Sequence, residues 1–243
     1  MPFVICSLYG YAKFLQMKKL LQDVYCGNLT GINITNVVHR RLNNDTKFES
    51  TADIDCDDGY FIEGRNQTAG ISTQQITCSD KGTWINMPVC VPKDCGRLDE
   101  LNLTNAENRS LINRTTIYTS LANISCDEGY KELNSSQVSG ITSTVIRCNE
   151  NGTWENLPKC VRKDCGTVKQ LNLTNLNLSS VQLHDDTVFN STADVECERG
   201  YYNEHGTQTS GLSTTTLTCS TKGNWENLPS CIPKGMYCLI QTL

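Results

Sequence analysis

The stretch that decides the fold is CDDGYFIEGRNQTAGISTQQITCSDKGTWINMPVC, residues 56–90 of a chain of 243 residues. It contains three cysteines, one tryptophan and several glycines, and acidic residues surround its first cysteine. Two interpretations compete. The stretch is either a metal or catalytic site, or part of a small domain held together by disulfides.

The composition of the whole chain favours small domains. Fourteen cysteines are spread along its length, while aromatic residues make up only 7% of it. Such a chain resembles several disulfide-stapled modules more than one large hydrophobic core. The formal net charge of −5 is mild and argues against nucleic acid or an anionic membrane as the main partner.

Twelve of the cysteines form three quartets with a repeated spacing. The second and third cysteines are 22 positions apart in every quartet, and the third and fourth are 12 apart, whereas the first interval varies from 30 to 32. The quartets are Cys26/Cys56/Cys78/Cys90, Cys95/Cys126/Cys148/Cys160 and Cys165/Cys197/Cys219/Cys231. This period predicts three modules, at residues 26–90, 95–160 and 165–231.

The residues between the cysteines repeat as well. CDDGY, CDEGY and CERGY follow the second cysteine, and GTW, GTW and GNW precede the fourth. Tryptophan occurs once per module, and we expect Trp84, Trp154 and Trp225 to lie in the cores. The tyrosines of the Gly-Tyr repeat are also expected in the cores: Tyr60, Tyr130 and Tyr201. Alternating polar and small or apolar residues predict strands in 48–56, 117–126 and 188–197, and in 72–78, 142–148 and 213–219.

The predicted fold is therefore all-β. Disulfides closing loops of these lengths contribute about 4 kcal/mol each in the chain-entropy model. Two in each module are comparable to the whole net stability of a small domain. The spacing alone leaves three possible connectivities in each quartet.

The combination of four cysteines, Cys-x-x-Gly-Tyr, Gly-x-Trp and Pro-x-Cys resembles the sushi, or complement control protein, module. The resemblance covers residues 26–231 three times over. It implies an elongated rod of modules, with each tryptophan beside a disulfide. It also implies the pairs Cys26–Cys78, Cys56–Cys90, Cys95–Cys148, Cys126–Cys160, Cys165–Cys219 and Cys197–Cys231.

Thirteen Asn-x-Ser/Thr sequons support a secretory origin. They begin at Asn28, Asn33, Asn44, Asn66, Asn102, Asn108, Asn113, Asn123, Asn134, Asn151, Asn172, Asn177 and Asn190. Together with the cysteines they predict a chain that is secreted or is the extracellular part of a membrane protein.

Metal and catalytic sites are not expected, and neither is a cofactor. Asp53, Asp55 and Asp57 alternate like the start of a calcium loop, but the glycine and the closing glutamate of that loop are missing. On a strand, these acids would form a solvated face. No CxxC zinc motif or Gly-x-Ser-x-Gly elbow occurs, and His39, His184 and His205 occupy non-equivalent positions typical of surface histidines.

The expected partners are extracellular proteins or glycoproteins. Each module has more acidic than basic residues, which disfavours polyanions; only residues 39–41, HRR, gather positive charge. Ligand choice is expected in variable loops at 33–44, 106–116 and 176–186, where the modules differ most, although their sequons would cover those loops with glycans.

The two ends lack the repeat pattern. Residues 1–25 make a poor signal peptide and are too short and charged for a membrane span. They contain either a short amphipathic helix or sequence that is not native. After residue 231 the third module should continue as IPKD-C, but residues 235–243 read GMYCLIQTL. One hypothesis is that this tail is translated intron sequence, in which case Cys6 and Cys238 have no module partners. The alternative is that these two cysteines pair with each other or with another chain.

The resemblance implies a non-enzymatic binding protein of the complement-regulator, adhesion or receptor-ectodomain type. The alternatives are the non-catalytic arm of a secreted serine protease and a purely structural spacer. These readings rest on fold-level analogy.

Overall fold

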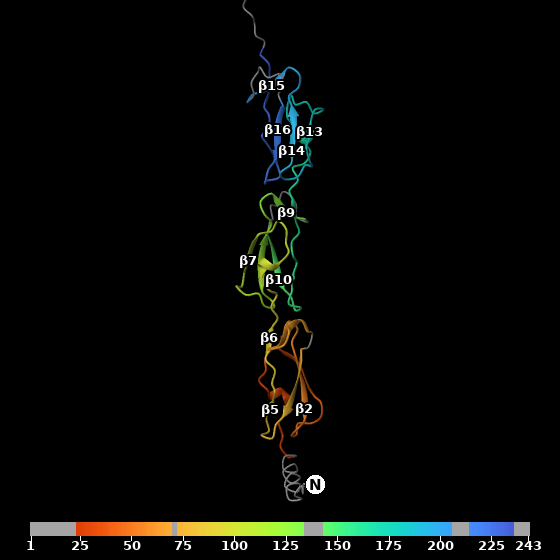
Figure 1. Cartoon of the computed structure of the whole chain (residues 1–243), viewed down its shortest axis with the longest axis vertical. Helices are drawn as coiled ribbons and strands as arrows, with labels where there is room; N and C mark the ends of the chain where they lie inside the picture. The colour runs from red at the N-terminus through yellow and green to blue at the C-terminus, as the bar shows by residue number, and fades with distance from the viewer. Residues whose placement is uncertain (1–22, 70–71, 134–142, 206–213, 236–243) are drawn as a thin grey trace, which may run out of the picture. The chain divides into compact units, whose positions relative to one another are not determined.

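The structure is a computed structural model that describes residues 23–69, 72–133, 143–205 and 214–235 (Figure 1). The described chain divides into two compact units, one made of residues up to 100 with 111–121 and 147–155, the other of 101–110, 122–146 and 156 onwards. The segments that join successive cysteine quartets, residues 91–94 and 161–164, each lie inside one unit. The arrangement of the modules as an elongated rod stays a prediction.

The described elements recur in the same order in each module. Module 1 contains η1 (Leu29–Gly31), β1 (Val37–Leu42), β2 (Thr51–Cys56), β3 (Tyr60–Ile62), η2 (Gln67–Ala69), β4 (Thr73–Cys78), β5 (Trp84–Ile85) and β6 (Cys90–Pro92). Module 2 contains η3 (Leu98–Glu100), β7 (Asn108–Leu111), β8 (Leu121–Ser125), β9 (Tyr130–Glu132), β10 (Ser143–Cys148), β11 (Trp154–Glu155) and β12 (Cys160–Arg162). Module 3 contains η4 (Val168–Leu171), β13 (Gln182–Leu183), β14 (Thr192–Glu196), β15 (Tyr201–Asn203), β16 (Thr214–Cys219), β17 (Trp225–Glu226) and β18 (Cys231–Pro233).

Each module has one four-stranded and one two-stranded sheet. The four-stranded orders are β1-β2-β4-β5, β7-β8-β10-β11 and β13-β14-β16-β17, and the two-stranded pairs are β3-β6, β9-β12 and β15-β18. Figure 1 shows β14 beside β16, which pair antiparallel. The all-β prediction is confirmed, since residues described by the structure contain no α-helix.

Alternation along the central strands builds each core. In β2, Ala52 and Ile54 are buried while Thr51 and Asp53 are not, because successive strand residues point to opposite faces. Ala52 pairs with Ile76 of β4 in module 1, as Ala193 pairs with Leu217 of β16 in module 3. The predicted strands before the second and third cysteines thus enclose the core.

The segments expected to be variable loops are not loops throughout. Residues 33–44, 106–116 and 176–186 contain the edge strands β1, β7 and β13. An edge strand pairs on one side only and tolerates polar, exposed residues, so the sequences VVHRRL, NRSL and QL show no run of alternating apolar and polar residues. This corrects the prediction for those parts of the three segments.

Candidate protein-binding surfaces

Each module is closed by two disulfides. The structure pairs the first cysteine of each quartet with the third and the second with the fourth. The pairs are Cys26–Cys78, Cys56–Cys90, Cys95–Cys148, Cys126–Cys160, Cys165–Cys219 and Cys197–Cys231. Cys6 and Cys238 lie outside the described residues.

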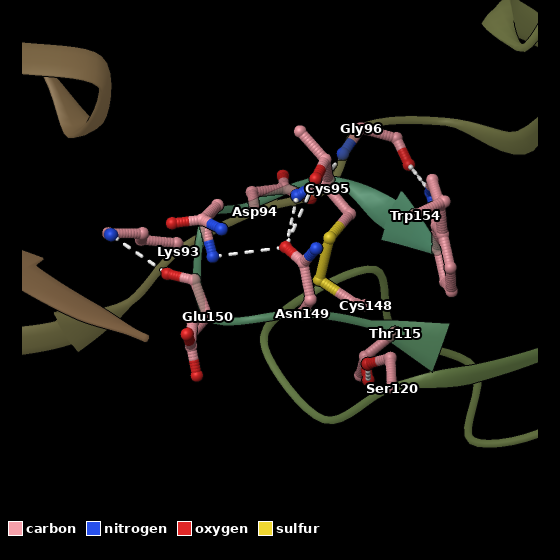
Figure 2. Close-up of a disulfide and its surroundings, with 12 residues drawn as sticks. Lys93, Asp94, Cys95, Gly96, Thr115, Ser120, Cys148, Asn149, Glu150 and Trp154 are labelled. Atoms are coloured by element: carbon pink, nitrogen blue, oxygen red, sulfur yellow. Dashed lines mark hydrogen bonds between the residues drawn. A yellow bond between two sulfur atoms is a disulfide. The ribbon is translucent and has the colours of Figure 1, made fainter. Parts of the chain in front are cut away.

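A tryptophan lies beside the first disulfide of each module. In module 2, the indole Nε1 of Trp154 donates to the carbonyl oxygen of Gly96 at 3.1 Å, next to Cys95–Cys148 (Figure 2). Trp84 and Trp225 make the equivalent bonds in their own modules, at 3.4 and 2.8 Å. All three side chains are buried, so they hold the shape of the module and are not available to a ligand.

The tyrosines of the Gly-Tyr repeat have a different place from the tryptophans. Tyr60, Tyr130 and Tyr201 are half-buried, and Tyr60 and Tyr201 pack against the edges of buried clusters. Tyr60 meets the ring of Tyr118 edge-to-face at 5.8 Å between centroids, and Tyr130 meets Phe189 in the same way at 5.9 Å. Tyr60 and Tyr130 therefore contact residues that follow the next linker.

Linker residue Lys93 bonds to the chain on both sides. Its N–H donates to the carbonyl oxygen of Gly59 at 2.8 Å, and its own carbonyl accepts from the N–H of Tyr118 at 2.7 Å. Its ammonium donates to the carbonyl oxygen of Glu150 at 2.8 Å (Figure 2). The side-chain amide of Gln67 also pairs with the backbone of the next linker residue, Asp94.

Lys163 repeats these bonds inside the second unit. Its N–H donates to Gly129 at 2.9 Å and its carbonyl accepts from Phe189 at 2.7 Å. Its ammonium donates to the carbonyl oxygen of Thr221 at 2.8 Å. The next residue, Asp164, has its pKa lowered, first by the hydroxyl of Thr187 and then by the N–H of Gly166.

The alternating acids of module 1 do not all form a solvated face. Asp53 is half-buried, but Asp55 is buried, and its carboxylate accepts from the guanidinium of Arg41 at 2.9 Å and from Thr73 at 2.5 Å. The prediction of a solvated face is wrong for Asp55, because β1 covers it with a basic side chain. No group of three His, Cys, Asp or Glu residues suited to a metal occurs in the described part of the chain.

The described histidines are exposed. His184 Nε2 lies 2.7 Å from a carboxylate oxygen of Asp194, and Thr216 donates to the other oxygen at 2.6 Å. The pKa of Asp194 is lowered, with Thr216 as the larger cause and His184 as the next. His39 and His205 are exposed at other places.

Most of the sequons lie on exposed residues. Asn33, Asn102 and Asn172 occupy the same place, seven positions after the first cysteine, and all three are exposed. Asn123 differs, because it is half-buried in β8 and its carbonyl oxygen accepts from the hydroxyl of Ser143. Asn134 lies outside the described residues. The structure therefore places one sequon asparagine per module at a position that all three modules share.

One segment of module 1 exposes more apolar surface than its equivalents. In residues 85–89, Ile85, Met87 and Val89 are 44%, 37% and 55% exposed. Modules 2 and 3 keep only the central apolar residue, and have Glu155 and Lys159, or Glu226 and Ser230, at the flanking positions. We call residues 85–89 the apolar segment. Sequence reasoning missed it, although aligning the three copies would have shown the two substitutions.

A disulfide-stapled β module with a tryptophan beside its first disulfide, used three times, defines an array of small extracellular domains. The sushi repeat (SCR repeat) family profile matches residues 26–90, 95–160 and 165–231. The chain belongs to the sushi family and is an extracellular array of protein-interaction modules.

Curated relatives share the modules and extend well beyond them. The rat (Rattus norvegicus) Sushi, von Willebrand factor type A, EGF and pentraxin domain-containing protein 1 is 29% identical over 189 residues, 76% of this chain and 4% of that protein. Beta-2-glycoprotein 1 of the dog (Canis lupus familiaris) is 26% identical over 178 residues, 72% of this chain and 44% of that protein. Rat mannan-binding lectin serine protease 1 is 33% identical over 118 residues, 45% of this chain and 15% of that protein.

No described helix is long and apolar enough to cross a membrane.

Proposed function

We propose that the chain is a non-enzymatic binding protein whose modules contact other extracellular proteins, with the apolar segment of module 1 as a main contact surface. The observation that supports this is the division of residues within the repeat. Cysteines, tryptophans and the repeated small residues hold the frame, so ligand choice is left to surface positions where the modules differ. Ile85 and Val89 are two such positions, and together with Met87 they expose three apolar side chains within five residues.

The experiment is a binding screen of the intact chain, tetramerised on streptavidin, against an array of purified secreted proteins and ectodomains. Any pair found is then remeasured with Val89→Lys and Ile85→Glu, which install the residues of module 2. Both substitutions are tolerated by the same frame in module 2, so folding should survive. We expect each to weaken binding at least tenfold, the effect of losing one well-packed interface anchor.

Ser230→Lys in module 3 is the matched control, since it adds the same charge at the equivalent position. It should leave affinity unchanged. An array without a single binder would contradict the proposed function. Equal affinity of Val89→Lys, Ile85→Glu and the unchanged chain would remove the apolar segment from it.

A second candidate is the non-catalytic arm of a secreted protease. It is favoured by the 33% identity to a relative whose name includes a serine protease. A full-length transcript separates the two candidates, because a downstream Gly-Asp-Ser-Gly-Gly would support the protease arm. The same transcript decides between a secreted chain and the extracellular part of a membrane protein.

Glycans and charge restrict the partner class in this proposal. We infer that Asn33, Asn102 and Asn172 carry glycans, because the three sequons are exposed at one shared position. The excess of acidic over basic residues in every module disfavours heparin-type partners. Elution of the glycosylated chain from a heparin column at physiological salt is the expected result, and retention would contradict it.

A further inference from the structure

A polar hollow lies beside one sequon of module 2. It has a volume of about 260 Å³ and is lined by Tyr118, Arg147, Asn149, Glu150, Asn151 and Glu155; we call it the module 2 hollow. All six residues belong to the same compact unit. Asn151 begins the sequon Asn-Gly-Thr and is exposed, so an asparagine that can accept a glycan forms part of the wall of the hollow.

Three of the lining residues differ from their equivalents in both other modules. Tyr118 has a hydroxyl that the phenylalanines at its place lack, Arg147 replaces a threonine, and Asn151 replaces a lysine. The equivalent residues are Phe48, Thr77 and Lys81 in module 1, and Phe189, Thr218 and Lys222 in module 3. The ring hydroxyl, the guanidinium and the sequon therefore occur together in one module and around one hollow.

The loop that carries Asn151 is held by hydrogen bonds. The side-chain oxygen of Asn149 accepts from the N–H of Asn151 at 3.0 Å, and from the N–H and hydroxyl of Thr153 at 3.1 and 3.0 Å. The carbonyl oxygen of Glu150 accepts from the ammonium of Lys93 at 2.8 Å (Figure 2). A group attached to Asn151 is therefore carried by a loop of defined conformation at the edge of the module 2 hollow.

The chemistry of the lining residues suits a sugar. Arg147 and Glu155, both described, are register partners across β10 and β11 but make no ion pair with each other. A guanidinium donates hydrogen bonds and a carboxylate accepts them, as the hydroxyl and acetamide groups of a sugar require. The half-buried ring of Tyr118 adds an apolar surface with a hydroxyl at its edge. These groups match the mixed apolar and polar surface of a pyranose ring.

We propose that Asn151 carries an N-linked glycan whose innermost N-acetylglucosamine lies in the module 2 hollow. The donor is a lipid-linked diphosphate oligosaccharide. The bond from its anomeric carbon to the diphosphate breaks, a bond from that carbon to Nδ2 of Asn151 forms, the lipid diphosphate leaves with the electron pair, and the amide nitrogen releases a proton. The sugar ring then stacks on Tyr118 and bonds to Arg147 and Glu155.

Size and covalent attachment favour this glycan over a free saccharide. Pockets for drug-sized ligands have volumes of about 300–1,000 Å³, so the module 2 hollow is too small for a ligand of several sugar units. A single free sugar ring makes few contacts and loses translational and rotational freedom when it binds. Attachment to Asn151 instead provides an effective concentration of order millimolar, at which a few contacts suffice.

The experiment measures how fast an endoglycosidase removes the glycan of Asn151 from the folded chain. The intact chain is secreted from mammalian cells that make only high-mannose glycans, and glycopeptide mass spectrometry gives the occupancy of Asn151. Endoglycosidase H, which cuts just beyond the innermost N-acetylglucosamine, is then added to the native chain and to the reduced, denatured chain. We expect release at Asn151 to be several-fold slower in the native chain than in the denatured chain.

Matched variants separate the hollow from the loop. Arg147→Thr installs the residue that modules 1 and 3 use, and it should speed native release at Asn151 several-fold. Arg162→Thr removes the same charge at an exposed position of β12 and should leave release slow. Lys81→Asn creates the same sequon in the equivalent loop of module 1, where the arginine and the tyrosine hydroxyl are missing. The glycan of that variant should be released equally fast from native and denatured chain.

Three results would overturn the proposal. The first is an Asn151 without a glycan, and the second is equal release at Asn151 from native and denatured chain. The third is slow release that persists in Arg147→Thr or that also occurs in Lys81→Asn, because the loop alone would then account for it. Near-ultraviolet circular dichroism reports folding of each variant. Tyr118→Phe, which keeps the ring used by modules 1 and 3, replaces Arg147→Thr if that variant does not fold.

Discussion

Modules 1 and 3 share the same strands and disulfides, but they hold the segment between the first cysteine and the edge strand in different ways. In module 1, the guanidinium of Arg40 donates to the carbonyl oxygens of Leu29 and Ile34 at 3.0 Å each. Val181 takes the equivalent place in module 3, one residue before Gln182, and packs against the buried cluster that contains Leu176. The frame therefore accepts either a cation that binds backbone carbonyls or an apolar side chain that extends the core.

The largest expected difference between the modules concerns tryptophan. Trp225→Ala should destabilise module 3 by about 3–5 kcal/mol, the cost of truncating a buried aromatic. Trp84→Ala should cost less in module 1, because its Nε1 bond is 3.4 Å long against 2.8 Å for Trp225. Denaturant unfolding followed by exchange of core amides in each module measures both. Equal losses in the two modules would refute the ranking.

The next prediction tests the hydrogen bonds of Arg40 in module 1. Arg40→Ala removes the donors to the carbonyls of Leu29 and Ile34 and should cost module 1 about 1–3 kcal/mol, the price of unsatisfied backbone groups that are partly buried. Val181→Ala should cost module 3 about 1 kcal/mol through lost apolar burial. Chemical denaturation of the two variants compares them. A smaller loss for Arg40→Ala than for Val181→Ala would show that the arginine bonds are dispensable.

A smaller effect depends on pH and on Asp164, whose place is taken by Tyr25 in module 1. The folded pKa of Asp164 lies below its ordinary value, because Thr187 and the N–H of Gly166 bond its carboxylate. The carboxylate therefore adds stability above the unfolded pKa of about 3.8, and that contribution is lost as pH falls through the lower folded pKa. Carboxyl carbon NMR titration should show Thr187→Val raising the pKa of Asp164. An unchanged midpoint would contradict the assignment, and Asp164→Asn identifies the resonance.

The smallest effect concerns the exposed pair of His184 and Asp194. The folded pKa of Asp194 is lowered, mainly by Thr216 and then by His184. His184→Gln should therefore raise the pKa of Asp194 less than Thr216→Val does, with little change in stability because the pair is solvent-exposed. NMR titration of both variants is the measurement, and a larger shift for His184→Gln would reverse the order of causes.

The sequence revealed the frame because frame residues repeat. Cysteine spacing, the Gly-x-Trp motif and the alternating strands before Cys56 and Cys78 predicted the module and its all-β class. The edge strand Val37–Leu42 was not predicted, because its side chains are mostly exposed and do not alternate between buried and exposed. Asp55 was misjudged for a related reason: its partner Arg41 lies 14 residues away on a strand that the pattern did not predict.

The functional surface was harder to predict than the frame. Exposure of Ile85 and Val89 depends on which strand faces are covered, and no local periodicity encodes that. The contacts around the linkers join residues about 60 positions apart, such as Tyr60 and Tyr118. Repetition marked the Gly-Tyr pair as shared, but only the structure shows that its ring partner follows the next linker.

The linker lysines have a consequence for turnover in protease-rich fluids. Lys93 and Lys163 are residues after which trypsin-like enzymes cut, and they lie in short segments between disulfide-closed modules. Their N–H, carbonyl and ammonium groups are all bonded, so the peptide must detach locally before it can enter a protease cleft. Limited digestion should therefore be slow at both lysines, and these linker contacts would thus set how long the array survives outside the cell.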